Sequence, residues 1–152
     1  MKKNNQIKLA WLAGIIDGEG AVFLIKEKNK PFVSASIQIT NTNFPMIAEV
    51  RKILDFNDIE YRTYDDKAGL IKKHKLEKRV YIQKVNSVSR ILELVKPYLV
   101  AKVLQGKLVS DFCKLRAKKS KLRSGNWEQE TKIYNQLRTI HKKPTSSATY
   151  HE

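Results

Sequence analysis

Residues 9–20, LAWLAGIIDGEG, run an apolar helical pattern directly into a glycine-rich turn that holds two carboxylates. Placed around a helix at about 100° per residue, the aliphatic, aromatic and small side chains leave almost no arc for water. The segment therefore predicts a helix over residues 6–17 that is buried on all sides. Such a helix needs a sheet on one side and a second covering element on another.

One arc of this helix carries only small residues and one acid. It comprises Ala10, Ala13, Gly14 and Asp17. Small side chains let a second helix approach closely, while Leu12 and Ile16 on a neighbouring arc can cover the sheet of the same subunit. The chain holds a single helix of this kind, so its simplest partner is the same helix of an identical subunit about a two-fold axis. We therefore predict a homodimer with these four small or acidic residues at its interface.

The turn after this helix carries its second acid. Gly18 and Gly20 permit a sharp exit of the backbone, which holds Glu19 at the base of the helix pair, beside its two-fold mate. Two carboxylates at helix C-termini repel each other and the helix dipoles unless a cation lies between them. Mg²⁺ prefers carboxylate, carbonyl, water and phosphate oxygens, all of which are present if DNA lies across the axis. The pattern thus indicates a metal-dependent phosphodiesterase site.

The charge of the chain points to a polyanionic partner. Thirty Lys and Arg residues against fifteen Asp and Glu residues give a formal net charge of +15, which favours nucleic acid. No apolar run approaches the roughly 20 residues that cross a bilayer, and the polar start MKKNNQ lacks the apolar core of a signal peptide. Cys113 is the single cysteine, so no intramolecular disulfide can form. We expect an intracellular protein with no membrane partner, in the cytoplasm or nucleoid, or in an organelle matrix.

The remaining chain gives an αββαββα order of elements followed by further helices. Alternating strand patterns cover residues 21–27, 32–40, 61–65 and 79–85. Helical patterns cover residues 44–58, a segment opened by Ser87, residues 98–118 and residues 126–141. The fold class is therefore α+β, with one domain over residues 1–141 and a basic and polar tail at residues 142–152.

Residues 12–20, LAGIIDGEG, are similar to the signature of the LAGLIDADG homing endonucleases. The matched positions are Leu12, Ala13, Gly14, Ile16, Asp17 and Gly20. Ile15 replaces a leucine, Gly18 an alanine and Glu19 the second aspartate, a substitution that the family accepts. The resemblance implies a LAGLIDADG homing endonuclease fold with a saddle-shaped antiparallel sheet and C-terminal helices. It also implies a single-motif homodimer that binds a long DNA duplex, cuts both strands and leaves 3′ overhangs.

The family pattern also implies catalytic roles for three residues. Glu19 corresponds to the metal-binding acid, with the carbonyl of Gly18 as the backbone ligand beside it and Mg²⁺, or another divalent cation such as Mn²⁺, as the ion. Asn41 falls where homodimeric members place a glutamine or similar residue near the attacking water. Lys102 falls where they often place a lysine that stabilises charge. Asp17 is more consistent with a structural role, as an acid that tethers the helix end or neighbouring backbone.

The second strand pattern separates an apolar face from a polar face that can meet base edges. Gln and Arg side chains can make bidentate contacts in the major groove, which admits a two-stranded ribbon. The strand residues expected to reach DNA are Lys26, Lys28, Ser34, Ser36, Gln38, Thr40, Arg62, Tyr64, Arg79, Tyr81 and Gln83. The first strand is apolar in both phases, so either its odd or its even residues can face the core.

The basic run KLRAKKSKLR at residues 114–123 is expected to contact phosphates through Lys118, Lys119 and Lys121. Two alternatives to a DNA endonuclease stay open at this point. An RNA maturase would use the same basic strands to assist splicing of an intron RNA, and a DNA-binding regulator would keep the fold without catalysis.

Overall fold

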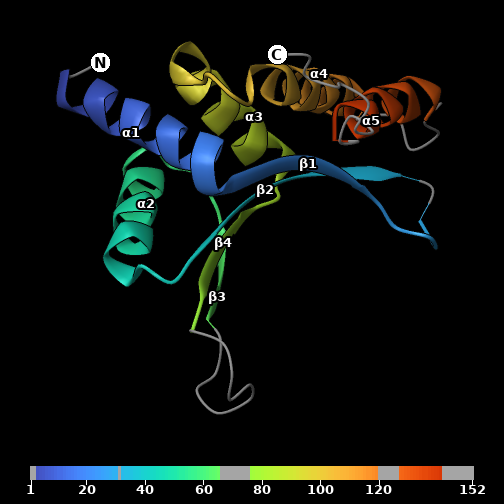
Figure 1. Cartoon of the computed structure of the whole chain (residues 1–152). Coiled ribbons are helices and arrows are strands. Elements are labelled where there is room, and N and C mark those ends of the chain that lie inside the picture. The colour runs from blue at the N-terminus through green and yellow to red at the C-terminus, as the bar shows by residue number, and fades with distance from the viewer. Residues whose placement is uncertain (1–2, 31, 66–75, 120–126, 142–152) are drawn as a thin grey trace, which may run out of the picture.

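A four-stranded antiparallel sheet with the strand order β1-β2-β4-β3 organises the molecule (Figure 1). The computed structural model describes residues 3–30, 32–65, 76–119 and 127–141. Its strands are β1 (Gly20–Lys26), β2 (Val33–Asn41), β3 (Arg62–Asp65) and β4 (Lys78–Ile82). Its helices are α1 (Lys3–Glu19), α2 (Phe44–Phe56), α3 (Val85–Val95), α4 (Val103–Lys119) and α5 (Glu128–His141), with a 3₁₀ turn η1 (Lys96–Tyr98) between α3 and α4. The predicted α+β class and αββαββα order are confirmed.

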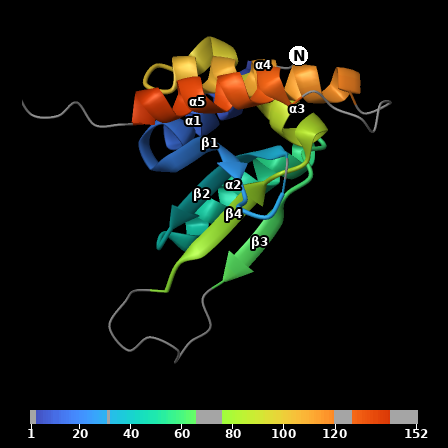
Figure 2. The ribbon, with the colours of Figure 1, turned by 90° about the vertical axis from the view of Figure 1, so that its right-hand side faces the viewer.

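The sheet is curved, and the described helices lie on one of its faces. In Figure 1, β1 and β2 sweep beneath α4 and α5, whereas β3 and β4 bend away below α2. The view turned by 90° shows the strands in front, with α2 behind them and α4 and α5 above (Figure 2). In both views, no helix of the described part of the chain covers the concave face of the sheet. This face is therefore open to a large ligand.

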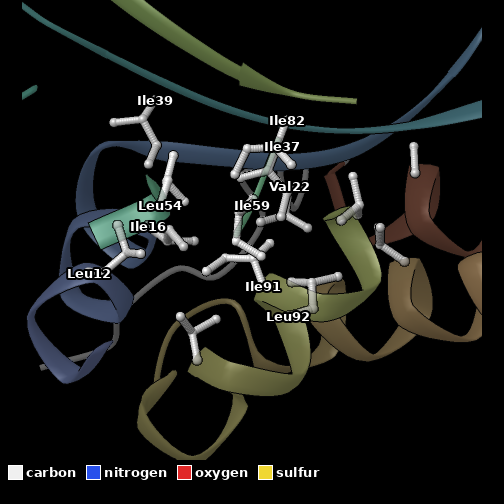
Figure 3. Close-up of a cluster of buried hydrophobic side chains, with 14 of the residues drawn as sticks. Leu12, Ile16, Val22, Ile37, Ile39, Leu54, Ile59, Ile82, Ile91 and Leu92 are labelled. Atoms are coloured by element: carbon white, nitrogen blue, oxygen red, sulfur yellow. The ribbon is translucent and has the colours of Figure 1, made fainter. Parts of the chain in front are cut away.

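The hydrophobic core fills the space between the sheet and its helices. Figure 3 shows strand residues such as Val22 and Ile37 pointing at Ile16 of α1 and Ile91 of α3. The buried phase of β1 contains Val22 and Leu24, which settles the question that the apolar sequence of this strand had left open. Phe23 and Ile25 consequently belong to the opposite, concave phase. In β2 the expected alternation of aliphatic residues toward the core is confirmed.

A pair of buried asparagines joins the start of α1 to the end of α2. Asn5 Nδ2 donates to Asn57 Oδ1 at 3.2 Å, and Asn57 Nδ2 donates to the carbonyl of Ile53 at 2.8 Å. Asp58 then adopts a left-handed conformation with φ of 55°, a region that Asn and Asp tolerate better than most residues. These contacts fix the angle between α1 and α2.

Three element boundaries differ from those that the sequence predicted. The third helix begins at Val85 rather than at Ser87, because Ser87 is buried and its hydroxyl accepts the backbone N–H of Glu60 at 3.2 Å. Val85 is therefore helical, and Gln83 lies just beyond the end of β4. The helix expected over residues 98–118 is divided, since Leu99 after η1 is extended and α4 starts at Val103.

Within the described residues, no helix combines the length and the hydropathy needed to cross a bilayer. The loop at residues 66–75, Lys121, the side chain of Lys119 and the tail at residues 142–152 lie outside the described part of the chain.

Candidate functional site

Glu19 is the last residue of α1, and its side chain is exposed at the junction with β1. The next residue must be glycine for a steric reason: a Cβ atom on Gly20 would lie 2.8 Å from both the Cα and the carbonyl oxygen of Ile16. These are backbone atoms that cannot move aside cheaply. The glycine therefore lets the chain turn directly from helix into strand, and this turn leaves the Glu19 carboxylate at the helix end.

Asp17 ties the end of α1 to the segment that precedes α4. Its carboxylate accepts the backbone N–H of Val100 at 2.7 Å and that of Lys102 at 2.9 Å. Partial burial opposes ionisation, but these backbone donors outweigh it and hold the pKa of the Asp17 carboxyl below its ordinary value. The tethering role expected for this acid is thus visible in its hydrogen bonds.

Lys102 lies beside the same helix end. Its ammonium group donates to the backbone carbonyl of Asp17 in a short, partly buried hydrogen bond. Lys102 and Asp17 are 85 positions apart in the sequence, yet they are in contact in the structure. Asp17 is two residues before Glu19, so Lys102 lies at the same helix end as this acid. Lys102 thus contacts the end of the helix that carries Glu19, and its predicted role in the chemistry stays a prediction.

Asn41 ends β2 on the side of the sheet where α1 joins β1. The strand register pairs Gly20 with Ile39, so Asn41 lies just past the start of β1. Its side-chain oxygen accepts the backbone N–H of Asn43 at 2.7 Å in the turn before α2. The residue is therefore close to the expected site in the sheet, and its predicted role near an attacking water stays a prediction.

The donor set of one chain fits half of a cation site. Glu19 offers a carboxylate, and the last turn of α1 offers carbonyls without intrahelical partners, including that of Gly18. An ideal Cβ on Gly18 would meet no atom within 4 Å, so its side of the helix is open. No group of three or more His, Cys, Asp or Glu side chains suited to a metal occurs among residues 3–30, 32–65, 76–119 and 127–141.

The outer face of α1 is apolar, and the described part of the chain leaves it uncovered. Ile7 is 63% exposed and Trp11 is 39% exposed, and they lie on the same side of the helix as Gly14 and Gly18. An ideal Cβ on Gly14 would also meet no atom within 4 Å. The helix was predicted to be buried on all sides with its partner subunit included, and in a single chain Trp11 is still exposed. The spacing Ile7, Trp11, Gly14, Gly18 was the available signal for this face.

Two of the four residues predicted at a dimer interface are engaged inside the chain. Ala13 is 0% exposed in the core, so its predicted place at an interface is wrong. Asp17 is used by the tether to Val100 and Lys102. Gly14 is exposed and Ala10 is half-buried, and both can contact a second helix.

The concave face of the sheet presents side chains in rows that cross the strands. One row joins Gln38 of β2, Tyr81 of β4 and Arg62 of β3 as register partners. A second row contains Thr40, Arg79 and Tyr64 in the same way. These six residues were all predicted to reach DNA, and the structure brings them together on the uncovered face.

Neighbouring residues on this face stiffen one another. Gln38 Nε2 donates to Thr40 Oγ1 at 3.0 Å, and the guanidinium of Arg79 lies 5.7 Å from the centre of the Tyr64 ring. Arg79 also forms an ion pair of 3.3 Å with Glu77. The polar groups are thus held in fixed positions, which is what recognition of base edges requires.

Three predicted DNA contacts have a different environment. Ser36 belongs to the concave phase but is only 1% exposed, so the prediction that it meets DNA directly is wrong. Lys26 follows the phase of Val22 and Leu24, and its exposed side chain therefore starts from the other face. Gln83 is exposed beyond β4.

Two further predicted contacts remain accessible. Ser34 is half-buried in the concave phase, and Lys28 is exposed in the turn after β1.

A cluster around Arg116 was not predicted. Arg116 of α4 donates to the carbonyl of Val33 at the start of β2 and forms an ion pair with the buried Glu130 of α5. Its guanidinium lies 4.6 Å from the ring centre of Trp127, 5.5 Å from that of Phe112 and 5.7 Å from that of Phe32. The cluster draws on residues from α4, α5 and the turn between β1 and β2, and no local sequence pattern signals it.

The sequence matches no protein-family model and no curated protein. One solved structure with the same fold is the homing endonuclease I-CvuI in complex with its target, with a TM-score of 0.70 and 19% sequence identity over 96% of this chain and 89% of that one. Another is the archaeal intron-encoded homing endonuclease I-Vdi141I complexed with DNA, with a TM-score of 0.67 and 16% identity over 95% of this chain and 89% of that one. The group I intron-encoded homing endonuclease I-CeuI complexed with DNA is also similar, with a TM-score of 0.65 and 15% identity over 97% of this chain and 70% of that one.

These likenesses define the class of fold. The chain has the fold of the LAGLIDADG homing endonucleases, with the motif at residues 12–20 on α1 and at the turn into β1. The family resemblance that the motif indicated is confirmed at the level of the fold.

Proposed function

We propose that this protein is a site-specific, metal-dependent endonuclease that cuts duplex DNA as a homodimer. The observation that carries the proposal is the position of Glu19. Its exposed carboxylate lies at the end of a helix whose outer face is uncovered, beside Lys102 and at the edge of an open, polar sheet face. The neighbouring solved structures are described as homing endonucleases in complex with DNA, which supports the same partner here.

A second copy of the chain is the occupant that best fits the outer face of α1. Ile7 and Trp11 supply apolar area, while Gly14 and Gly18 leave room for close backbone approach. The face would meet itself about a two-fold axis, as in most homodimers. Such contact would place two copies of Glu19 near each other.

In each subunit, Glu19 and the carbonyl of Gly18 would hold a cation, with DNA phosphate completing the oxygen ligands. When bound, it would supply Lewis-acid stabilisation of charge that develops on the phosphodiester. Mg²⁺ fits this donor set, and Mn²⁺ is a second candidate.

The chain's own residues have distinct tasks in this proposal. Asp17 holds the segment before α4 against the helix end, and this contact positions the ammonium group of Lys102. That cation offsets negative charge next to the scissile phosphate. Asn41, at the same end of the sheet, orients the attacking water through its amide. Each subunit would then cut one strand, leaving 3′ overhangs.

The concave face would read the DNA. The rows that contain Gln38 and Arg79 carry groups suited to base edges, and the net charge of +15 supplies attraction to phosphates. The curvature of the sheet visible in Figure 2 lets one subunit follow several base pairs of a duplex.

The test is cleavage of DNA that carries the uninterrupted insertion locus of the protein's own gene, with Mg²⁺ or with chelator. We expect Mg²⁺-dependent double-strand cutting by the protein and no cutting by Glu19→Gln, with DNA binding retained. Glu49→Gln, which changes a half-buried acid on α2 that pairs with Lys8 and Lys52, is the matched control and should cut normally. Undiminished cutting by Glu19→Gln would overturn the assignment. Intron splicing without duplex cleavage would replace it with the maturase alternative.

A further inference from the structure

The outer half of the β1–β2 hairpin is a two-stranded ribbon. The register pairs residues 23–26 of β1 with residues 33–36 of β2, whereas β4 pairs with β2 only from Ile37 onward. Figure 1 shows this part of the hairpin extending beneath α5, away from β3 and β4. A two-stranded ribbon alone is marginally stable in water. Leu24, Val33 and Ala35 of this ribbon are buried, and both strands contact α4 and α5, so the position of the ribbon depends on these two helices.

Arg116 supplies contacts of the right kind. Its Nη2 atom lies 2.5 Å from the carbonyl oxygen of Val33, the first residue of β2. The same nitrogen forms an ion pair of 3.3 Å with Glu130, whose side chain is 0% exposed. The guanidinium also lies 4.6 Å from the ring centre of Trp127 and 5.7 Å from that of Phe32. One side chain thus joins α4, α5 and the base of the hairpin turn.

The position of the ribbon matters for the proposed reading of DNA. β1 starts directly after Glu19, and its residues advance by about 3.3 Å each, close to the roughly 3.4 Å that separates successive base pairs. Residues 24–26 of β1, five to seven positions past Glu19, therefore lie about five to seven base pairs from the scissile phosphate along the groove. Its concave side chains include Ile25 and Ser34, which are register partners.

We propose that Arg116 is a positioning residue that holds this ribbon at a fixed angle and thereby sets selectivity at the outer base pairs of the target. The inference rests on the proposed function, since it presumes that the concave face reads a duplex. It assigns a specificity role to a residue whose contacts lie on the helix-covered side of the sheet, opposite the concave face. The contact with a backbone carbonyl is what transmits this role to the strand.

The first variant removes the whole pair. Arg116→Met alone would strip the ion pair from the buried Glu130, so the test uses Arg116→Met together with Glu130→Met, a replacement that buried pairs often tolerate. Arg116→Lys is a second variant that keeps the positive charge and loses the planar fork of donors. Arg90→Met is the matched control, because it removes an exposed arginine of α3 that pairs with Asp58.

The measurement selects and sequences bound and cleaved members of a randomised duplex DNA pool. We expect the double variant to lose about tenfold of its discrimination at base pairs five or more from the cut and to change less than twofold nearer the cut. Arg116→Lys should lie between wild type and the double variant, and Arg90→Met should match wild type. Unchanged outer selectivity in a folded double variant, or equal loss at inner and outer positions, would overturn the proposal.

Hydrogen exchange of the DNA-free protein separates this inference from the proposed function. Amides of residues 33–36 should exchange faster in the double variant, while those of residues 37–41 should not. If the wild-type protein neither binds nor cuts any duplex in the pool, the proposed function and the selectivity role both fail. Hydrogen exchange then tests only whether Arg116 anchors the ribbon. If the amides of residues 33–36 exchange at the same rate in the double variant and in wild type, the anchoring role fails as well.

Discussion

Asp17 and Lys102 hold each other through two separate hydrogen bonds. The carboxylate of Asp17 accepts the backbone N–H of Lys102 at 2.9 Å, and the ammonium group of Lys102 donates to the backbone carbonyl of Asp17. The pair joins the acid-bearing end of α1 to the segment before α4. This contact therefore positions two groups of the proposed site: the helix end that carries Glu19 and the side chain of Lys102.

Asp17→Asn should destabilise the protein by roughly 1–3 kcal/mol, since a charged acceptor of two backbone donors becomes neutral. The pKa of Asp17 is lowered on folding, so its contribution to stability is complete above its ordinary value of 3.8 and is lost as the pH falls through the lower folded value. Urea unfolding at several pH values between 3 and 6 (roughly) checks this. The difference in unfolding free energy between wild type and Asp17→Asn should shrink toward the acid end. A constant difference would contradict the account.

Gly20→Ala should cost about 1–3 kcal/mol, because the added methyl would meet backbone atoms of Ile16 at 2.8 Å. Thermal or urea unfolding of the variant measures this cost. Gly18→Ala adds the same methyl where no atom of a single chain lies within 4 Å, so any cost it carries should come from the proposed helix pair and should vary with protein concentration. Equal stability of wild type and Gly20→Ala would show that the turn into β1 does not depend on close approach.

Gly14→Leu tests the proposed dimer. The added side chain has open space in a single chain, so the fold should be retained, as circular dichroism can check. At a helix pair, the same side chain would separate the backbones and weaken association at least tenfold. Sedimentation of the DNA-free and DNA-bound proteins measures this effect. A wild-type protein that is monomeric on duplex DNA would contradict the dimer directly.

Gln38→Ala and Lys118→Ala should affect DNA binding in different ways. Loss of Gln38 removes a group of the concave face and should relax preference at one base pair, at a cost of about 1–3 kcal/mol. Lys118 is exposed near the end of α4, and its loss should weaken all duplexes equally and reduce the salt slope by about one. Binding titrations at several salt concentrations, on matched and mismatched duplexes, separate the two. A shift of sequence preference in Lys118→Ala would contradict its phosphate role.

The order of elements could be predicted because each has a strong local pattern. The alternation of β2 and the helical spacing of α2 are confirmed with boundaries that shift by a few residues. Ser87 shows where local reasoning fails: a residue typical of helix starts is buried in the first turn, because its hydroxyl satisfies the backbone of Glu60. Such long-range hydrogen bonds leave no trace in neighbouring sequence.

The candidate site was predictable in its acid and less so in its surroundings. The glycine turn placed Glu19 at a helix end, and the structure agrees. Ala13 was misplaced around α1, because helical phase alone does not tell which arc the sheet will take. Ser36 was misplaced for a related reason. Strand phase predicts which face of the sheet a residue lies on, but it does not predict whether neighbouring side chains bury that residue. The Arg116 cluster needed the packing of α4 and α5, which no local pattern specifies.

The most direct test of the central claim is cleavage by a mixed dimer with one wild-type subunit and one Glu19→Gln subunit. The account predicts that each copy of Glu19 serves one strand, so the mixed dimer should nick a supercoiled target plasmid and accumulate open circles with little linear product. Full linearisation by the mixed dimer, at the rate of the wild-type protein, would contradict it.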